Sequence, residues 1–301
     1  MGVRTMEWQT DKRLGITFGI AILVALLLFG VGVFLYLRSR SVDLLTFLGG
    51  LAIVLSLPTM AAVVYLLIGL RRSGYALDRN QLTIIWGATG HVIPTRLIDQ
   101  IVPAETVSSR IRFRGGRWPG LWVGQGDVPG IGLTLFNATA AWEQLLFVIT
   151  DVAAYAISPI DREGFIQAFE TRKAMGPTQD VLQASIRPPL FDLPLWTDRV
   201  AQRLMIGAVF LCAALFAYVC LRYPDLPSRI PLHFNAAGVP DRFGGPAEVF
   251  ILPAIGLLAL SVNVLAGVPI YLRERLPAYL LWGGAILAQG LLWVAAVTLL
   301  G

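Results

Sequence analysis

The stretch Gln81–Trp86, with the sequence QLTIIW, decides the fold because the hydrophobic pattern of the chain changes there. Before the segment Tyr75–Lys173, apolar residues follow one another without interruption. From it onward apolar and polar residues alternate, as in Arg110–Arg114 and Leu145–Thr150, with turn residues between the runs. Successive side chains of a strand point to opposite faces of a sheet, so this pattern predicts half-buried strands. We therefore expect a β domain over Tyr75–Lys173.

A helix is expected to close this domain. Asp161 follows a Ser-Pro pair and is suited to cap a helix N-terminus. Phe165, Ile166 and Phe169 recur at the spacing of one helical face. An all-β unit with one C-terminal amphipathic helix follows from these residues.

Four signatures recur in order along the domain. They are Tyr75-x-Leu77-x-x-x-x-Leu82-x-Ile84, Gly90-x-x-Ile93-Pro94, Gly116-Arg117-x-Pro119-Gly120-x-x-Val123-Gly124, and Tyr155-x-Ile157-Ser158-Pro159-x-Asp161-x-x-x-Phe165. With these signatures the segment 75–172 resembles a bacterial pleckstrin-homology-like (PH-like) domain. The resemblance implies a seven-stranded, strongly bent sheet capped by the helix and used for binding or scaffolding, without catalysis.

The composition is that of a polytopic membrane protein. Of 301 residues, 56% are hydrophobic and only 14% are charged, which is far too apolar for an ordinary soluble protein. The net charge of +5 is modest and is explained by arginines that flank membrane segments. We therefore expect no nucleic-acid partner.

Five segments are long and apolar enough to span a bilayer. Leu14–Leu37 contains no charged residue and would be about 36 Å long as a helix, against a hydrocarbon core of about 30 Å. The five predicted spans are 14–37, 44–70, 204–221, 249–272 and 277–300. The predicted fold class is therefore a polytopic α-helical membrane protein with an inserted all-β PH-like domain.

These segments divide the chain into four regions. We predict an N-terminal transmembrane hairpin over 1–72, the β domain over 73–173, a Pro-rich linker with an interfacial lead-in over 174–203, and a C-terminal membrane module over 204–301 that contains the loop 222–248.

The distribution of arginine and lysine predicts the orientation. Positive residues in Met1–Arg13 and at Arg71 and Arg72 favour a cytoplasmic N-terminus and a cytoplasmic β domain, whereas Arg38 and Arg40 oppose this orientation. Five spans then place the C-terminus and the loop 222–248 outside. The expected location is the bacterial inner membrane.

The loop 222–248 carries the second informative motif. It contains His233-Phe234-Asn235-x-x-Gly238-x-Pro240-Asp241 after a series of prolines. Together with its flanking helices, over 204–272, it resembles an uncharacterised bacterial membrane domain that also occurs in Sdp-type toxin-immunity and signalling membrane proteins. The resemblance implies an immunity-like role for this module.

The same loop offers one set of candidate metal ligands. His233, Asp241 and Glu248 are of ligating types, but no cysteine or second histidine accompanies them. The alternative is a structural loop in which Asn235 and Asp241 cap turns. We expect no bound metal, no cofactor and no catalytic residue.

Four arginines form a candidate contact patch. Arg110, Arg112 and Arg114 occupy alternate positions and should share one strand face, with Arg117 close behind. One interpretation is a patch for anionic lipid or a protein partner, and the other is a solvated outer face.

The predicted spans contain almost no ionisable residues, which disfavours ion-coupled transport. Asn263 and Gln289 are the polar exceptions, and we expect each to hydrogen-bond across helices unless it lines a ligand path.

The leading hypothesis is a non-enzymatic membrane protein that binds membrane lipids or a protein partner through its PH-like domain. One alternative is a toxin-immunity or envelope-stress component acting through the loop 222–248. Another is a small-molecule transporter or membrane enzyme that uses His233, Asp241 and Asn263.

Overall fold

The computed structural model describes residues 5–107, 111–189, 193–237 and 239–300. Internal contacts divide the chain into two compact units. The first unit consists of Met1–Leu28 and Leu57–Asp192, and the second of Phe29–Ser56 and Leu193–Gly301. The division passes through the middle of the N-terminal helical hairpin.

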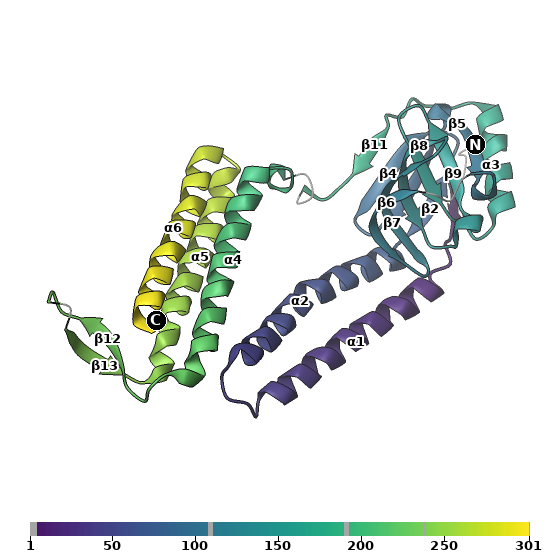
Figure 1. The fold of residues 1–301 in the computed structure, drawn as a ribbon. Helices are drawn as coiled ribbons and strands as arrows, with labels where there is room; N and C mark the ends of the chain where they lie inside the picture. The colour runs from purple at the N-terminus through teal and green to yellow at the C-terminus, as the bar shows by residue number, and fades with distance from the viewer. Residues whose placement is uncertain (1–4, 108–110, 190–192, 238, 301) are drawn as a thin grey trace. The chain divides into compact units, whose positions relative to one another are not determined.

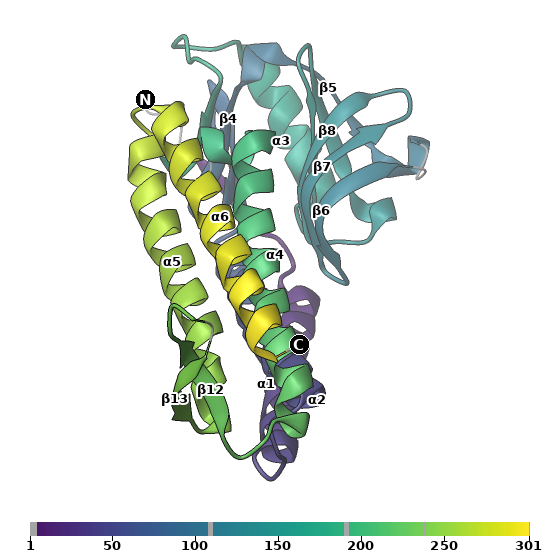
Figure 2. The same cartoon turned by 60° about the vertical axis from the view of Figure 1, so that its left-hand side comes forward.

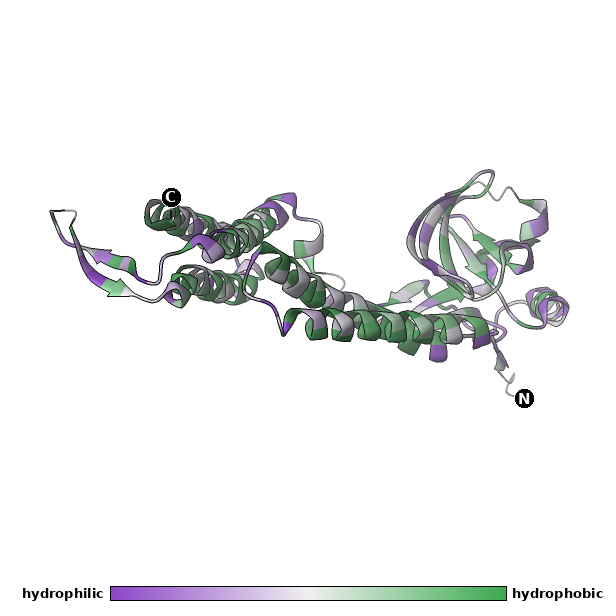
Figure 3. Ribbon diagram, turned by 60° about the horizontal axis from the view of Figure 1, so that its bottom comes forward, coloured by the Kyte–Doolittle hydropathy of each residue, from purple (hydrophilic) through white to green (hydrophobic). Residues whose placement is uncertain are grey.

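The hairpin consists of two long apolar helices, α1 (Arg13–Leu37) and α2 (Leu44–Arg71) (Figure 1). They agree closely with the first two predicted spans. A turn joins them, and Asp43 ends that turn by accepting a hydrogen bond from the Thr46 amide at 2.7 Å. Apolar residues cover most of both helices (Figure 3), and each is long and apolar enough to cross a membrane.

The β domain in the first unit contains two sheets. The first has the order β1-β2-β3-β4-β11 and the second β5-β9-β10-β8-β7-β6. The strands of the first sheet are β1 (Met6–Trp8), β2 (Gly74–Leu77), β3 (Gln81–Trp86), β4 (Thr89–Pro94) and β11 (Ala184–Ile186). Those of the second are β5 (Ile98–Pro103), β6 (Arg112–Trp118), β7 (Leu121–Val128), β8 (Gly132–Ala138), β9 (Leu146–Thr150) and β10 (Ala154–Ile157). All neighbouring strands pair antiparallel except β8 and β10, which are parallel.

Helix α3 (Arg162–Met175) closes the domain, as the sequence predicts. The Asp161 carboxylate accepts a hydrogen bond from the Gly164 amide at 2.9 Å and so caps the helix. Phe165 and Phe169 are fully buried in a core that also receives Tyr75 and other apolar side chains of the two sheets. The amphipathic pattern therefore fixes which helix face contacts the sheets (Figure 2).

The implied single sheet of seven strands is wrong for the described residues. Strands β2 to β10 already number nine and are shared between two sheets. The first sheet also recruits β1 from the N-terminal segment and β11 from the predicted linker. The predicted hairpin region, 1–72, and the predicted linker, 174–203, therefore each contribute a strand to the β domain.

The glycine pairs Gly115-Gly116 and Gly124-x-Gly126 lie within the paired strands β6 and β7 and not in turns. Gly115 lies directly opposite Gly124 in the middle of the two strands. A Cβ atom on Gly115 would lie 2.2 Å from the Val123 carbonyl oxygen, and one on Gly124 would lie 2.3 Å from that of Arg114. Glycine is needed at both positions because the two backbones approach too closely for a side chain.

A buried hydrogen-bond network joins the two sheets. The Tyr75 hydroxyl of β2 donates to the Asn137 carbonyl oxygen of β8 at 2.7 Å and accepts from the Ser158 amide at 2.8 Å. The Ser158 hydroxyl in turn accepts from the Thr139 amide at 2.8 Å. Burial raises the pKa of Tyr75 to about 12, so its hydroxyl keeps its proton at every physiological pH. Two of the signature residues, Tyr75 and Ser158, thus have a structural role.

The second unit contains a three-helix module. Its helices are α4 (Arg199–Arg222), α5 (Ile251–Tyr271) and α6 (Arg275–Leu300), which pack side by side (Figures 1 and 2). With α1 and α2 they make five helices that are long and apolar enough to cross a membrane, within the described residues.

Asp198 ties the three helices of this module together. One carboxylate oxygen caps α4 by accepting from the amides of Val200 and Ala201 at 2.9 and 3.1 Å. The other accepts the hydroxyls of Tyr271 from α5, at 2.8 Å, and Tyr279 from α6. These bonds, that of Tyr279 foremost, hold the pKa of Asp198 at about 2, so the carboxylate is charged whenever the protein is near neutral pH.

The predicted loop 222–248 contains ordered structure. Strands β12 (Ile230–Phe234) and β13 (Pro240–Gly244) pair antiparallel with two register shifts. They form a two-stranded hairpin between α4 and α5 (Figure 1). An isolated two-stranded hairpin is only marginally stable in water, so this hairpin depends on packing against the helices for its stability. Ile230 and Val249 supply that attachment by packing with Val219 and Leu300 of the helices.

The Tyr75 network generates a test of the fold. Tyr75→Phe removes one hydroxyl and leaves a buried carbonyl oxygen and a buried amide without their partner, which costs about 1–3 kcal/mol. We expect the melting temperature of the full chain in detergent to fall by several degrees. Tyr36→Phe, on the exposed surface of α1, is the control and should leave the melting temperature unchanged. Equal melting temperatures for all three proteins would contradict this role of Tyr75.

Candidate functional site

The β domain is docked on the ends of the membrane hairpin. The turn between β6 and β7 lies against the first turn of α1, where the Trp118 indole donates to the Gly15 carbonyl oxygen at 3.2 Å. Gly120 lies so close to Gly15 that a Cβ on Gly120 would be 2.3 Å from the Gly15 nitrogen. Leu70 of α2 packs with Trp86 and Leu121 in a small buried core at the same junction. The domain is therefore packed directly on both helices.

Polar bonds complete the junction. The Lys12 ammonium donates to the Arg71 carbonyl oxygen at 3.0 Å, and this bond joins the start of α1 to the end of α2. Burial lowers the pKa of Lys12. The buried hydroxyls of Thr10 and Ser73 lie 3.2 Å apart. The segment before α1 is thus held beside the segment after α2.

This docking gathers basic residues around the base of the hairpin. We call the group the basic collar, and its members are Lys12, Arg13, Arg71, Arg72 and Arg117. All except Lys12 are exposed. In the sequence, the first four residues flank the apolar helices and predict only the orientation. The fold adds Arg117 to them by bringing the β6–β7 turn to the start of α1.

Arg117 lines a cavity of about 630 Å³ beside the start of α1. Its guanidinium lies over the Trp122 ring, 3.8 Å from the ring centroid, in a cation–π contact. Asp11 and Leu14 line the cavity from the α1 side, and Gln144 contributes a polar group to its wall. The cavity therefore combines the positively charged Arg117 side chain, which the Trp122 ring holds in place, with apolar surface at the start of α1.

The four arginines of the predicted patch do not share one surface. Arg112 and Arg114 alternate along β6 as expected and are exposed. Arg117 lies three positions after Arg114, and because side chains alternate along a strand it points to the opposite face of β6. There it lies opposite Trp122 of β7. Arg114 lines a different cavity from Arg117. Arg110 lies outside the described residues.

The residues of the loop motif lie on the hairpin β12–β13. His233 Nδ1 is 2.6 Å from Asp241 Oδ1, with both side chains exposed. Asn235 does cap a turn, since its side-chain oxygen accepts from the amides of Ala237 and Val239 at 3.0 Å each. Gly238 and the side chain of Phe234 lie outside the described residues.

Glu248 does not join His233 and Asp241. Its carboxylate instead accepts from the Gly245 amide at 3.0 Å at the start of the turn that precedes α5. Asp241 pairs with the histidine rather than capping a turn, which corrects the structural interpretation of that residue. The described residues contain no group of three or more His, Cys, Asp or Glu side chains arranged to hold a metal ion.

The two polar residues inside predicted spans behave differently. Gln289 of α6 is completely buried and donates to the Gly256 carbonyl oxygen of α5 at 2.7 Å, so the expected bond across helices is confirmed. Asn263 donates at 2.8 Å to the Ala259 carbonyl oxygen in its own helix, so the same expectation is wrong for Asn263.

Comparison with known proteins identifies two domains. Residues 73–173 match the family model of the bacterial PH domain, and residues 210–257 match a domain of unknown function, DUF1648. An uncharacterized protein of Archaeoglobus fulgidus is 41% identical over 66 residues, which cover 22% of this chain. The match spans about a third of that relative, 34% of its length. No solved structure matches.

Together these findings define the class of protein. The chain carries a bacterial PH domain and a DUF1648 domain, and its five apolar helices indicate a multi-pass membrane protein. The basic collar lies where the first of these domains meets the membrane hairpin.

The docking of the β6–β7 turn on α1 can be tested with matched glycine substitutions. Gly120→Ala places a methyl group against the backbone of α1 and should separate the turn from the helix. Gly130→Ala is the control, because Gly130 has a similar positive φ of 84°, against 81° for Gly120, but open space around it. Both changes carry similar backbone strain, so their difference reports the contact.

We expect Gly120→Ala to speed amide hydrogen exchange in residues 13–20 and 118–122, while β9 and β10 keep their protection. Gly130→Ala should affect only its own turn. Equal exchange of residues 13–20 in the two variants would show that Gly120 does not hold the domain on α1.

Proposed function

We propose that the protein is a non-enzymatic integral membrane protein whose PH domain binds anionic lipid headgroups at the membrane surface. The basic collar is the observation that carries this proposal. It surrounds the point where two apolar helices leave the β domain, and the docking of the β6–β7 turn holds Arg117 there.

The charge balance of the collar favours anionic lipid. Its five basic residues outnumber the acidic residues that line the adjoining cavities, which are Asp11 beside Arg117 and Glu7 beside Lys12 and Arg72. Each basic residue near an anionic leaflet contributes about 1 kcal/mol to binding. The cation–π contact with Trp122 fixes the Arg117 guanidinium in advance, which reduces the entropy lost when a headgroup binds.

The proposal includes an orientation. An excess of arginine and lysine marks cytoplasmic ends of membrane helices, and the anionic lipids of the inner membrane face the same side. We infer a PH domain on the cytoplasmic side of a bacterial inner membrane, with the hairpin β12–β13 and the C-terminus outside. In this arrangement the PH domain scaffolds a lipid patch, or a protein partner that the patch recruits.

Replacement of Arg117 tests the role of the collar. The full chain is purified in mild detergent with a mixture of zwitterionic and anionic lipids, and the retained lipids are counted by native mass spectrometry. We expect Arg117→Gln to lower the preference for anionic lipid about fivefold, which corresponds to about 1 kcal/mol, and added salt to weaken the wild type similarly. Arg71→Gln with Arg72→Gln should have a larger effect.

Arg112→Gln is the matched control, since Arg112 is exposed on the same strand and about 16 Å from Arg117 at 3.3 Å per residue. An unchanged lipid preference in Arg117→Gln and in the double variant would overturn the proposal. Loss of a co-purifying protein, with lipid unchanged, would assign the collar to a protein partner instead.

The hairpin β12–β13 favours a second candidate, an immunity or envelope-stress component. It exposes Val239 and Phe243, at 55% and 56%, beside the His233–Asp241 pair. Exposed apolar residues on a projecting hairpin suit contact with a membrane-active peptide, as the resemblance to Sdp-type immunity proteins implies.

We expect Phe243→Ser to abolish protection of cells challenged with such a peptide, because it removes an apolar contact surface. The folded module should be unaffected, since the side chain is exposed. Arg117→Gln is the control and should keep protection. Full protection by Phe243→Ser at normal protein abundance would exclude the hairpin as the contact surface.

A further inference from the structure

A second cavity in the β domain is basic and separate from the collar. It has a volume of about 360 Å³ and opens between the two sheets. Its charged and titratable side chains are His91 of β4, Arg114 of β6 and Arg187, which follows β11. Thr89, Gln125 and Asn137 add polar groups, and Val123, Leu135 and Phe136 add apolar ones. No carboxylate lines this cavity in the described part of the chain.

Among the described residues, neither Arg114 nor Arg187 takes part in an ion pair. Two guanidinium groups that converge on one cavity repel each other and leave their forked donors available. An anion would relieve that repulsion and accept those donors.

His91 adds a third donor position. Its Nδ1 atom lies 2.8 Å from the Ser185 hydroxyl, and its ring is 5.4 Å from that of Tyr155. Burial, and secondly the charge of Arg187, lower the pKa of His91, so the imidazole is neutral at pH 7. The groups that face it are Arg187 and Ser185 from the β11 segment, Arg114 from β6 and Tyr155 from β10.

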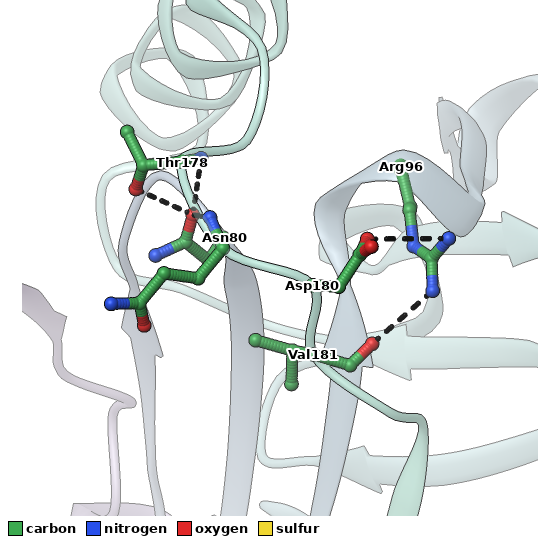
Figure 4. A network of polar contacts seen from close by, with 6 residues as sticks. Asn80, Arg96, Thr178, Asp180 and Val181 are labelled. Atoms are coloured by element: carbon green, nitrogen blue, oxygen red, sulfur yellow. Dashed lines mark hydrogen bonds and ion pairs between the residues drawn. The ribbon is translucent and has the colours of Figure 1, made fainter.

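Arg187 lines the cavity because residues 176–187 are held on the β domain. The Asn80 side-chain oxygen accepts from the Thr178 amide and hydroxyl at 2.8 and 2.9 Å, and Arg96 contacts Asp180 and the Val181 carbonyl oxygen, both at 3.5 Å (Figure 4). Gln183 then bonds the Tyr155 hydroxyl at 3.0 Å. These contacts place β11 beside β4 and bring Arg187 to the cavity.

We infer that this cavity binds a phosphate monoester through Arg114, Arg187 and His91. Phosphate carries about −1.5 to −2 charges near pH 7 and has three acceptor oxygens, which match two guanidinium forks and an imidazole. A single carboxylate would leave one arginine uncompensated. The volume suits a small organic phosphate, or a lipid headgroup of the same chemistry.

Occupancy has a consequence for the chain beyond the cavity. Strand β11 has three residues, all of them exposed, and among the described strands it pairs with β4 alone. A ligand held by both Arg114 and Arg187 would fasten this weak edge strand to the second sheet. The cavity beside Arg114 and the cavity beside Arg117 have no lining residue in common, although both receive side chains from strand β6. The two proposals therefore stand independently.

Glycerol 3-phosphate is a suitable probe, because it is a soluble phosphate monoester and is phosphatidate without its acyl chains. The full chain in uncharged detergent is titrated with glycerol 3-phosphate by equilibrium dialysis, with glycerol as the uncharged comparison. Arg114→Gln and Arg187→Gln should each weaken binding roughly tenfold or more, because each removes a charge-assisted bidentate contact. Arg112→Gln, two residues away on the same strand but outside the cavity, should bind like the wild type.

The dependence on pH tests His91. Protonation of His91 adds a positive charge, so wild-type affinity should rise, relative to His91→Gln, as the pH falls from 8 to 6. The ligand titrates identically in both experiments, so its own charge change cancels in the comparison. Amide exchange of 184–186 should slow on binding in the wild type and not in Arg187→Gln.

Nanodiscs that contain phosphatidate form the second arm. Protection of 184–186 by phosphatidate but not by free glycerol 3-phosphate, lost in Arg114→Gln, would support the site with a lipid headgroup as its ligand. Binding of neither probe by the wild type, or equal binding by wild type, Arg114→Gln and Arg187→Gln, would overturn the inference.

Discussion

The close approach of Gly15 and Gly120 is the constraint on which the first unit depends. Two backbones meet there without side chains between them, and the Trp118 indole adds a hydrogen bond to the Gly15 carbonyl oxygen. A PH domain on a flexible tether would sample many orientations. Here the β6–β7 turn is seated on α1, a helix long and apolar enough to cross a membrane, so the side chains beside that turn are held at the start of that helix.

The elements that sequence predicts best are those whose signal is local. Apolar runs gave all five long helices, and Asp161 marked the start of α3 because an N-cap is a property of neighbouring residues. Strands β1 and β11 have only three residues each and no alternating pattern. Their existence depends on pairing with β2 and β4, and nothing within either strand indicates a partner distant in the chain.

The candidate sites could be predicted only in part, because they too combine local signals with contacts between distant segments. The alternation of Arg112 and Arg114 follows from strand geometry, but the face that each side chain meets depends on the neighbouring strand. Arg187 stands in a proline-rich segment that resembles a linker, and only the contacts of Asn80 and Arg96 bring it to a cavity. Asp198 was missed because its partners, Tyr271 and Tyr279, lie on two other helices.

Strand β6 gives the two basic sites a shared support and separates them. Arg114 and Arg117 are three residues apart, about 10 Å along a strand, and point to opposite faces. The Debye length in physiological salt is about 8 Å, so charge–charge coupling between the two arginines is mostly screened. Communication between the collar and the phosphate cavity would therefore have to pass through the backbone. Gly115 lies between the two arginines on β6, and its backbone is so close to that of Gly124 that a displacement of β6 toward β7 at this point would have to move β7 as well.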